Sequence, residues 1–209
     1  MSHRIVPGMK TYPGLPEPRS EVLLDYEQSA ARYSNKSEFL IASLHLCGNT
    51  GTYVDSPRHR HRDGVDLAGL PLERLAHIPV VRVDVTTRAI GVEAFGGAQV
   101  DGKAVLVHTG WSRHWRTEGY FQGHPFLTAD AAEFLVRAGC VFAGIDSLNI
   151  DDTENPARPA HTILLGSGVP VCEHMTNLAA VEPGGFLHAV PIAWEGGASF
   201  PVRAYVVYL

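Results

Sequence analysis

The sequence predicts a mixed α/β fold in which strands outnumber helices. Apolar runs at residues 104–108 and 140–145 have the length and composition of buried strands. Between them, residues 128–138 carry apolar side chains at the spacing of an amphipathic helix. A strand, a helix and a strand in this order indicate a right-handed crossover between parallel strands. The chain contains no internal repeat or low-complexity tract, so we expect a single domain over residues 1–209.

The remaining elements are predicted from local composition. Residues 1–35 are rich in proline, glycine and charge, and we expect an irregular arm around a short strand at residues 4–7. Leucines at roughly helical spacing predict a short helix at residues 67–76, and Pro71 suits its first turn. Apolar runs predict four further strands at residues 39–46, 78–85, 187–193 and 202–208.

The helix at residues 128–138 has clear start and stop signals. Thr128 is expected to cap its first turn, and Asp130 lies at the positive end of the helix dipole. Gly139 is a natural C-terminal stop because glycine adopts the left-handed conformation easily.

Composition excludes several classes of function. Hydrophobic residues make up 45% of the chain and charged residues 19%, an ordinary balance for a globular protein. The formal net charge of -5 argues against a nucleic-acid surface or a polybasic membrane patch. No stretch approaches the ~20 apolar residues of a membrane helix, and no signal peptide is recognisable. The widely spaced Cys47, Cys140 and Cys172 indicate free thiols, and we expect a cytoplasmic protein.

Ionisable groups gather at three places that follow strand-like segments. Asp55 and His59 lie in the first, residues 144–151 form the second, and His161 and Glu173 lie in the third. Carboxylates and imidazoles from distant segments are the usual components of a divalent-metal site or an acid–base site. Because the chain holds 11 His and 22 acidic residues, spacing alone does not select one site.

Other ionisable residues at these places are expected to have supporting roles. Asp146 and Asp151 follow a buried strand, and we expect them to cap turns through local side-chain to backbone bonds. His61 and His174 flank candidate site residues. Neighbours on a strand point to opposite faces, so we expect these two imidazoles to be solvated or to support the site from outside.

A long segment at residues 109–127 concentrates aromatic side chains. It carries Trp111, Trp115 and Phe126, together with Tyr120 and Phe121. Long connections are often functional, and these rings could line a pocket for a flat apolar ligand. They could equally pack the segment onto the body of the protein or form a contact between subunits.

Motif matches run nearly from end to end of the chain. They are Pro7-Gly8-Met9, Tyr12-Pro13-Gly14, Gly51-Thr52, Asp55-Ser56-Pro57, His59, residues 105–111, Gly144-Ile145-Asp146-Ser147, Asp151, His161, Leu164-Leu165, Pro170, Glu173, Asn177-Leu178 and Pro201-Val202-Arg203-Ala204. Taken together, they resemble the cyclase family that includes bacterial kynurenine formamidase and isatin hydrolase. The resemblance implies a swivelling β/β/α fold, a mixed sheet with few helices, and a homodimer or homotetramer. It also implies hydrolysis of amide or lactam-like bonds of small aromatic molecules with zinc or manganese and no organic cofactor.

The family's central motif has the form His-x-Gly-Thr-His-x-Asp-x-Pro-x-His. The two leading His and the Asp bind metal, the last His acts in catalysis, and a later His and Glu share a second metal with the Asp. Asn49 and Tyr53 replace the two leading His in this chain. An amide is a poor substitute for imidazole on zinc, and a phenol with a reference pKa near ~10 is no better. The matching residues are Asp55, His59, His161 and Glu173.

Three interpretations remain open. In the first, one divalent metal occupies the second position, held by Asp55, His161 and Glu173, and His59 shuttles a proton. In the second, no metal binds, and Asp55, His59 and Tyr53 form an acid–base group for an isomerisation, dehydration or cyclisation. In the third, catalysis is lost and the protein binds a small aromatic ligand or a partner subunit.

The first interpretation makes the most specific predictions. The protein is expected to be a hydrolase that cleaves an amide, lactam or ester of a small carbonyl compound with one Zn or Mn ion. Asp55 and His59 are the expected catalytic residues, and Asp55 doubles as a metal ligand with His161 and Glu173. The expected substrate-binding residues are Asn49, Tyr53, Trp111, Trp115 and Phe126.

Overall fold

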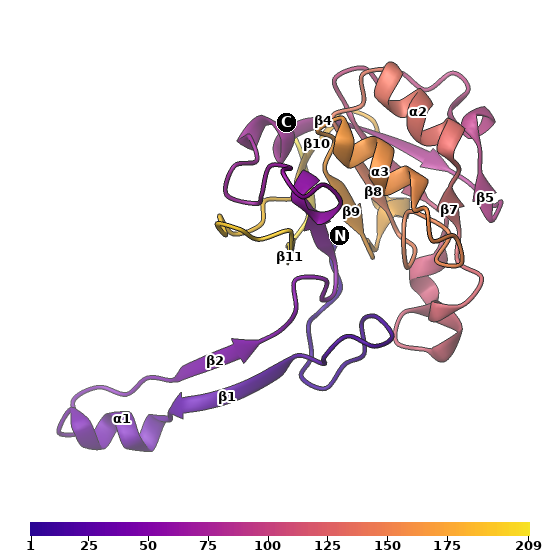
Figure 1. Ribbon diagram of the computed structural model, residues 1–209. Helices are drawn as coiled ribbons and strands as arrows, with labels where there is room; N and C mark the ends of the chain where they lie inside the picture. Colours follow the sequence, from indigo (N-terminus) through magenta and orange to yellow (C-terminus); the bar gives the residue numbers. More distant parts are fainter.

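Eight strands form one mixed sheet in the order β11-β3-β9-β8-β6-β4-β10-β12, in a computed structural model that describes residues 1–209 (Figure 1). The four neighbours β9, β8, β6 and β4 run parallel, and the outer strands pair antiparallel. Their bounds are β3 Tyr53–Asp55, β4 Ala76–Asp84, β6 Ala104–His108, β8 Phe142–Ile145, β9 Val171–Glu173, β10 Gly185–His188, β11 Ser199–Pro201 and β12 Tyr205–Tyr208.

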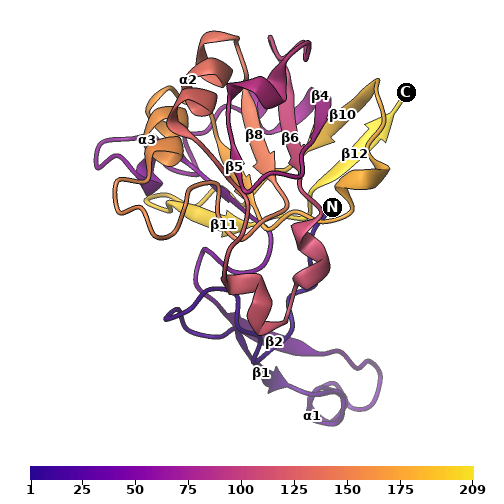
Figure 2. The ribbon, with the colours of Figure 1, turned by 90° about the vertical axis from the view of Figure 1, so that its right-hand side faces the viewer.

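Apolar side chains cover both faces of the parallel strands. Val105 and Val107 of β6 point into one core, and Ala104 and Leu106 point into the other, as the alternation of a strand requires. The first core is closed by the helices α2 (Ala129–Arg137) and α3 (Pro159–Gly166) (Figure 2). Strands buried on two faces are apolar almost throughout, which explains why β6 and β8 were recognisable.

The predicted crossover is confirmed, with β6, α2 and β8 in that order and β6 parallel to β8. Gly139 ends the helix region with a φ of 81° in the left-handed conformation. Thr128 occupies the predicted N-cap position, but its side chain accepts no hydrogen bond from a backbone N–H of the helix. Its hydroxyl instead lies 3.1 Å from the carbonyl oxygen of Ile90 and contacts the carboxylate of Asp130.

Several predicted elements are shorter or different in the structure. The expected helix at residues 67–76 is a single 3-10 turn, η2 (Leu72–Arg74), which begins directly after Pro71. The strand expected at residues 202–208 is present as β12, which begins only at Tyr205. The strand expected at residues 187–193 is present as β10, which begins at Gly185 and already ends at His188. The other short elements are β5 (Ala89–Ile90), η1 (Pro57–His59), η3 (Val92–Phe95), η4 (Trp111–His114), η5 (Glu118–Phe121), β7 (Phe126–Leu127) and η6 (Leu178–Ala180).

The N-terminal arm is irregular, as predicted, only over residues 1–18, and it is regular beyond them. It contains β1 (Arg19–Leu24), α1 (Tyr26–Arg32) and β2 (Ile41–His45), and β1 and β2 form an antiparallel hairpin that extends away from the sheet (Figures 1 and 2). Asp25 and Gln28 form a capping box at the start of α1, a local signal that composition concealed. The strand expected at residues 4–7 is absent, and only an isolated bridge joins Ser2 to Met175.

The strand predicted at residues 39–46 is present as β2, but it lies in the exposed arm and not in the core. The polar run after it reaches the main sheet as a separate strand, β3, which pairs with β9 and β11.

None of the helices combines the length and the apolar character needed to cross a bilayer.

Candidate active site

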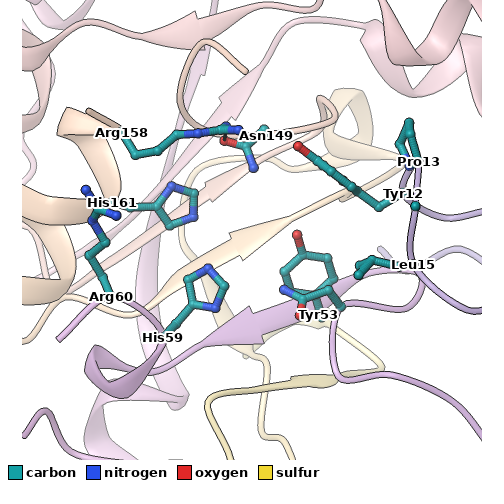
Figure 3. A pocket seen from close by; sticks show the side chains of 11 residues that line it. Tyr12, Pro13, Leu15, Tyr53, His59, Arg60, Asn149, Arg158 and His161 are labelled. Atoms are coloured by element: carbon teal, nitrogen blue, oxygen red, sulfur yellow. Dashed lines mark hydrogen bonds between the residues drawn. The ribbon is translucent and has the colours of Figure 1, made fainter. Parts of the chain in front are cut away.

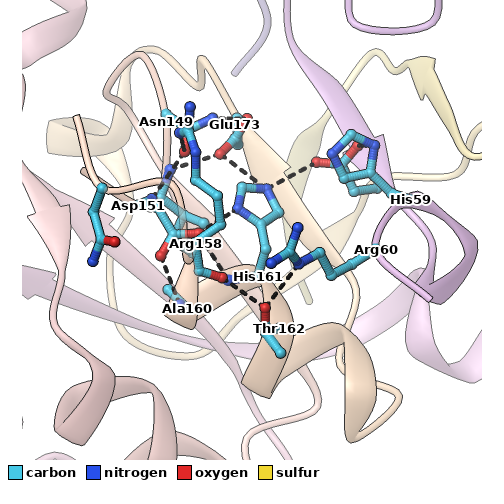
Figure 4. A network of polar contacts seen from close by, with 12 residues as sticks. His59, Arg60, Asn149, Asp151, Arg158, Ala160, His161, Thr162 and Glu173 are labelled. Atoms are coloured by element: carbon cyan, nitrogen blue, oxygen red, sulfur yellow. Dashed lines mark hydrogen bonds and ion pairs between the residues drawn. The ribbon is translucent and has the colours of Figure 1, made fainter. Parts of the chain in front are cut away.

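Three distant segments bring ionisable side chains together at one end of the sheet. Antiparallel pairing of β3 with β9 places Tyr53 opposite Glu173, and Asp55 lies two residues further along β3. The 3-10 turn η1 follows at once and carries His59. His161 comes from α3, a helix that was not predicted. The four residues that match the family motif therefore lie around one centre (Figure 4).

His161 lies at the middle of this centre and contacts three carboxylates. Its Nδ1 is 2.7 Å from Asp151 Oδ2, and its Nε2 is 3.5 Å from Asp55 Oδ2 and 3.4 Å from Glu173 Oε1. Burial lowers the pKa of His161, but the negative charges of Glu173 and Asp55 and the hydrogen bond to Asp151 outweigh burial and raise the pKa to about 10. The imidazole is thus held in a strongly negative environment.

Asp151 orients His161, a role that the sequence did not reveal. Besides the contact with Nδ1, its carboxylate accepts the backbone N–H groups of Ala160 at 2.6 Å and His161 at 3.0 Å. Burial raises the pKa of Asp151. The hydrogen bonds from His161 and the charge of His161 outweigh burial and lower this pKa, so the carboxylate stays ionised. Asp151 therefore does not cap a local turn, as was expected. Its carboxylate links the loop after β8 to the start of α3.

Glu173 is fully buried and accepts hydrogen bonds on both oxygens. The hydroxyl of Tyr53 donates to Oε2, the Asn149 amide lies 3.4 Å from the same atom, and the Ile150 N–H donates to Oε1 at 2.6 Å. Burial raises the pKa of Glu173 to about 7. Burial and the charge of Glu173 raise the pKa of Tyr53 well above 10, so Tyr53 stays a neutral phenol that donates to Glu173.

Asp55 connects His161 to His59. Ser199 on β11 donates to Asp55 Oδ1 and also lies 3.0 Å from His59 Nδ1, which itself is 3.4 Å from Asp55 Oδ1. Burial raises the pKa of Asp55, but the charges of His59 and His161 and the bond from Ser199 outweigh it and lower the pKa. Ser199 was missed because only the pairing of β3 with β11 brings it opposite Asp55.

Two atoms at the centre show that a metal cation fits these residues. Asp55 Oδ2 and His161 Nε2 are buried, have no hydrogen-bond partner, and face each other at 3.5 Å. Donation of the Nδ1 hydrogen to Asp151 leaves Nε2 with a free lone pair, the usual arrangement of a histidine ligand held by a carboxylate. Carboxylate oxygen with imidazole nitrogen suits a hard or borderline divalent ion.

Two side chains, His59 and Glu173, lie where they could supply a third ligand. Asp55, His59 and His161 offer ligand atoms within 4.8 Å of one another, and Glu173 does not belong to that group. Glu173 Oε1 is nevertheless 3.4 Å from His161 Nε2 and keeps a second lone pair beside the one that accepts from Ile150. We favour Glu173, because His59 Nδ1 is already directed at Ser199 and Asp55.

A cavity of about 430 Å³ adjoins this centre (Figure 3). His59, His161, Asn49 and Tyr53 line it, as does Asn149, while Asp55 and Glu173 are buried behind them. Tyr12, Pro13 and Leu15 form the side opposite His161, and Arg60 and Arg158 lie on the His161 side. Tyr12, Pro13 and Gly14 entered the sequence analysis only as part of the motif match, and Leu15 and Arg158 were not predicted to lie at the site.

The predicted aromatic residues Trp111, Trp115 and Phe126 do not line this cavity. Trp115 stacks on His3 with ring centroids 4.0 Å apart, and the Trp111 indole donates to the Tyr120 carbonyl oxygen at 3.0 Å. Phe126 lies under the Arg88 guanidinium. Within one chain these rings pack the long segment onto the body, and their expected contact with substrate stays a prediction.

The supporting residues also differ from expectation in detail. His174 is buried, its Nδ1 lies 3.0 Å from the Tyr120 hydroxyl, and its ring lies 5.3 Å from that of Tyr53, so it supports the site from outside, as one of the two expectations had it. His61 Nε2 lies 3.1 Å from the Thr162 carbonyl oxygen. Asp146 accepts the N–H groups of Thr109 at 2.8 Å and Gly110 at 2.9 Å, so it holds a turn after β6 rather than its own.

Comparison with known proteins places the chain in a family. The sequence model of the Cyclase family matches residues 1–152. Kynurenine formamidase of Salinibacter ruber is 31% identical over 208 residues, which cover 98% of this chain and 94% of the relative. Kynurenine formamidase of Bacillus cytotoxicus is 29% identical over 199 residues, covering 94% of this chain and 90% of the relative. The chain belongs to the cyclase family, as its motifs indicated.

Solved structures confirm the fold that the resemblance implied. Isatin hydrolase A from Labrenzia aggregata superposes with a TM-score of 0.86 at 21% identity, over 99% of this chain and 91% of that one. A protein described as a potential metal-dependent hydrolase with cyclase activity gives a TM-score of 0.79 at 24% identity, over 98% and 94% of the two chains. The swivelling α/β architecture, a mixed sheet with few helices, is therefore shared with both.

Proposed function

We propose that the protein is a hydrolase that cleaves an amide, lactam or ester of a small aromatic carbonyl compound with one divalent metal. Asp55, His161 and Glu173 hold the metal, and His59 carries the proton. The observation that carries the proposal is the pair of buried, unpartnered atoms, Asp55 Oδ2 and His161 Nε2, beside an open cavity of about 430 Å³. The names of the relatives, which are hydrolases, support the same class of reaction.

Each ligand is held by a partner of its own. Asp151 fixes the tautomer and the direction of His161, and Ser199 holds Asp55. Tyr53 and the Ile150 N–H hold Glu173. A bound Zn²⁺ or Mn²⁺ would supply Lewis acidity at this position. Such supporting bonds fix ligand orientation before the ion arrives, so little reorganisation is needed on binding.

His59 is placed to move protons at the edge of the cavity. Its side chain is 34% exposed, whereas that of Asp55 is 1% exposed, so the imidazole reaches both the buried centre and the solvent-filled cavity. Asp55 and Ser199 hold its Nδ1 side. An imidazole in this position can take a proton from the attacking water and return it to the leaving group.

The proposal is tested by turnover with and without metal. Purified protein is assayed with formanilide, isatin and phenyl acetate, which present an amide, a lactam and an ester on one aromatic ring. We expect hydrolysis of at least one compound, loss of that activity after dialysis against EDTA, and recovery on addition of Zn²⁺ or Mn²⁺. Absence of hydrolysis with all three compounds and both metals would contradict the proposal.

One observation favours a second candidate function, metal-free acid–base catalysis. The three carboxylates hold the pKa of His161 at about 10, so an imidazolium could neutralise them without a metal. Asp55 and His59 would then run a cyclisation or isomerisation by proton transfer, while the hydroxyl of Tyr53 stays bonded to Glu173. Full activity after EDTA treatment, in protein that elemental analysis shows to be metal-free, would select this alternative.

We propose further that two copies of the chain form a homodimer. Val22, Leu23 and Leu44 of the hairpin arm are 56%, 56% and 55% exposed, and an isolated two-stranded hairpin is only marginally stable in water. A second uncovered apolar set, Val190, Ile192 and Trp194, lies on the loop before β11. Because the arm points away from its own body, a second copy is the partner that covers both sets.

Light scattering on a sizing column tests the dimer. We expect a mass of twice 22.7 kDa for the wild type at micromolar concentration. Val22→Asp with Leu44→Asp places two charges on one face of the hairpin and should give monomers, because burying an unpaired carboxylate is costly. Lys36→Glu, an exposed charge change in the same arm, should leave the dimer intact. A wild type of 22.7 kDa would rule the dimer out.

A further inference from the structure

Two guanidinium groups at the cavity have no carboxylate partner. Arg60 and Arg158 line the cavity and form no ion pair. Most arginines of the chain also form no ion pair, and only Arg82, Arg88 and Arg137 do. Arg60 and Arg158 differ from the rest because they line the cavity and are held there by hydrogen bonds to neutral acceptors. A positively charged side chain that faces a concave site without a counterion indicates a negatively charged ligand.

Arg158 is held in place by the loop that carries the site. Its Nη1 donates to Asn149 Oδ1 at 3.1 Å and its Nη2 donates to the Thr153 carbonyl oxygen at 3.4 Å. These two bonds leave several of the five guanidinium hydrogens unused. Arg158 also has a φ of 47° and a ψ of 59°, a left-handed conformation that is unusual for arginine. Such strained residues persist where the surroundings fix them, and they concentrate at ligand-binding sites.

Arg60 is fixed from the opposite side of His161. It follows η1, directly after His59, and its Nε donates to Thr162 Oγ1 at 2.8 Å. Its Nη2 donates to the Ala157 carbonyl oxygen at 2.7 Å. Both arginines are thus held by neutral oxygen acceptors near the start of α3, and neither forms an ion pair (Figures 3 and 4).

We propose that the substrate carries a carboxylate group that Arg158 and Arg60 bind. The planar fork of arginine matches a carboxylate in a bidentate manner, a geometry that it also offers to a phosphate. The apolar part of the substrate lies against Tyr12, Pro13 and Leu15, on the facing side of the cavity. The reacting carbonyl lies toward His59, and that part of the inference rests on the proposed hydrolase function.

The charge of the two arginines also bears on how an anionic substrate would be repelled at this site. Asp55, Asp151 and Glu173 would repel an anionic substrate across the low-dielectric wall of the cavity. The divalent ion of the proposed function would offset part of this negative charge, and the two guanidinium groups that line the cavity add positive charge on the His161 side. A neutral substrate would need no such compensation.

Binding of benzoate and benzamide tests the inference without any turnover. The two compounds have nearly the same shape and differ in charge, and titration calorimetry on the protein as purified gives both dissociation constants. We expect the wild type to bind benzoate at least about tenfold more tightly than benzamide. A factor of this size is what one charge-assisted hydrogen-bonded pair contributes to binding. Arg158→Gln should bring the ratio near one, and Arg60→Gln should reduce it.

The controls separate binding from folding and from general charge effects. Arg137→Gln removes the same charge from α2, outside the cavity, and should keep the benzoate preference. Arg158→Lys keeps the charge but loses the fork, so it should retain only part of the preference. Thermal melting identifies a variant that fails to fold. Equal binding of the two compounds by wild type, or an unchanged ratio in folded Arg158→Gln, overturns the inference. A hydrolase with that result would still satisfy the proposed function.

Discussion

Replacing His59 by Asn is expected to lower kcat by about a hundredfold or more with little change in KM. An asparagine amide can still reach toward Ser199 and Asp55, but it cannot accept and return a proton. General acid–base catalysis by a positioned side chain typically contributes a factor of about 10² to 10⁴. Initial rates on the compound that the wild type hydrolyses best provide the measurement.

His61→Asn is the matched control for this substitution. His61 lies two residues further along the chain and contacts the Thr162 carbonyl oxygen, outside the cavity at the site. The same chemical change there should leave kcat within about twofold of wild type, as is usual for a surface position. A His59→Asn protein that turns over at the wild-type rate would remove His59 from the mechanism.

Replacing Glu173 by Gln is expected to remove the metal and the activity together. The substitution keeps the volume of the buried side chain but takes one negative charge and one ligand oxygen from the centre. Elemental analysis of protein prepared without chelator should show about one divalent ion per chain in wild type and little in the variant. Asp55→Asn should have the same effect, since Asp55 Oδ2 is the unpartnered ligand atom.

Two comparisons make this prediction sharp. Asp152→Asn neutralises an acidic side chain that pairs with Arg88 beside the same loop, and it should keep the ion. His59→Asn should also keep the ion if Glu173 is the third ligand. Loss of metal in His59→Asn with retention in Glu173→Gln would instead assign the ion to Asp55, His59 and His161, the group whose ligand atoms lie within 4.8 Å.

Elements whose signal is local could be predicted from the sequence. The strand β6 coincides with its predicted range, and α2 lies within one residue of its prediction at each end, because burial on both faces and amphipathic spacing appear directly in the residue order. The helix α3 was missed because it is short and apolar around most of its surface, so it has no amphipathic period. Pro159 at its first position was the available signal.

The residues of the site could be predicted from the sequence only where the family motif includes them. Asp55, His161 and Glu173 were predicted from the family motif, and the structure places both carboxylates beside Nε2 of His161. The contact of Asp151 with His161 and the presence of Ser199 at the site were not predicted, because these contacts span 10 and 144 residues of sequence. The packing of Trp111 and Trp115 likewise depends on the path of a long loop, which residue composition does not determine.

The position of the metal is the most direct test of how this site works. Crystals soaked in Mn²⁺ and measured near the manganese absorption edge reveal the ion by its anomalous signal. We expect one peak per chain, bonded to Asp55 Oδ2, His161 Nε2 and Glu173, with His59 outside the coordination sphere. A peak bonded to His59 in place of Glu173, or no peak near His161 in crystals of an active protein, would contradict the account.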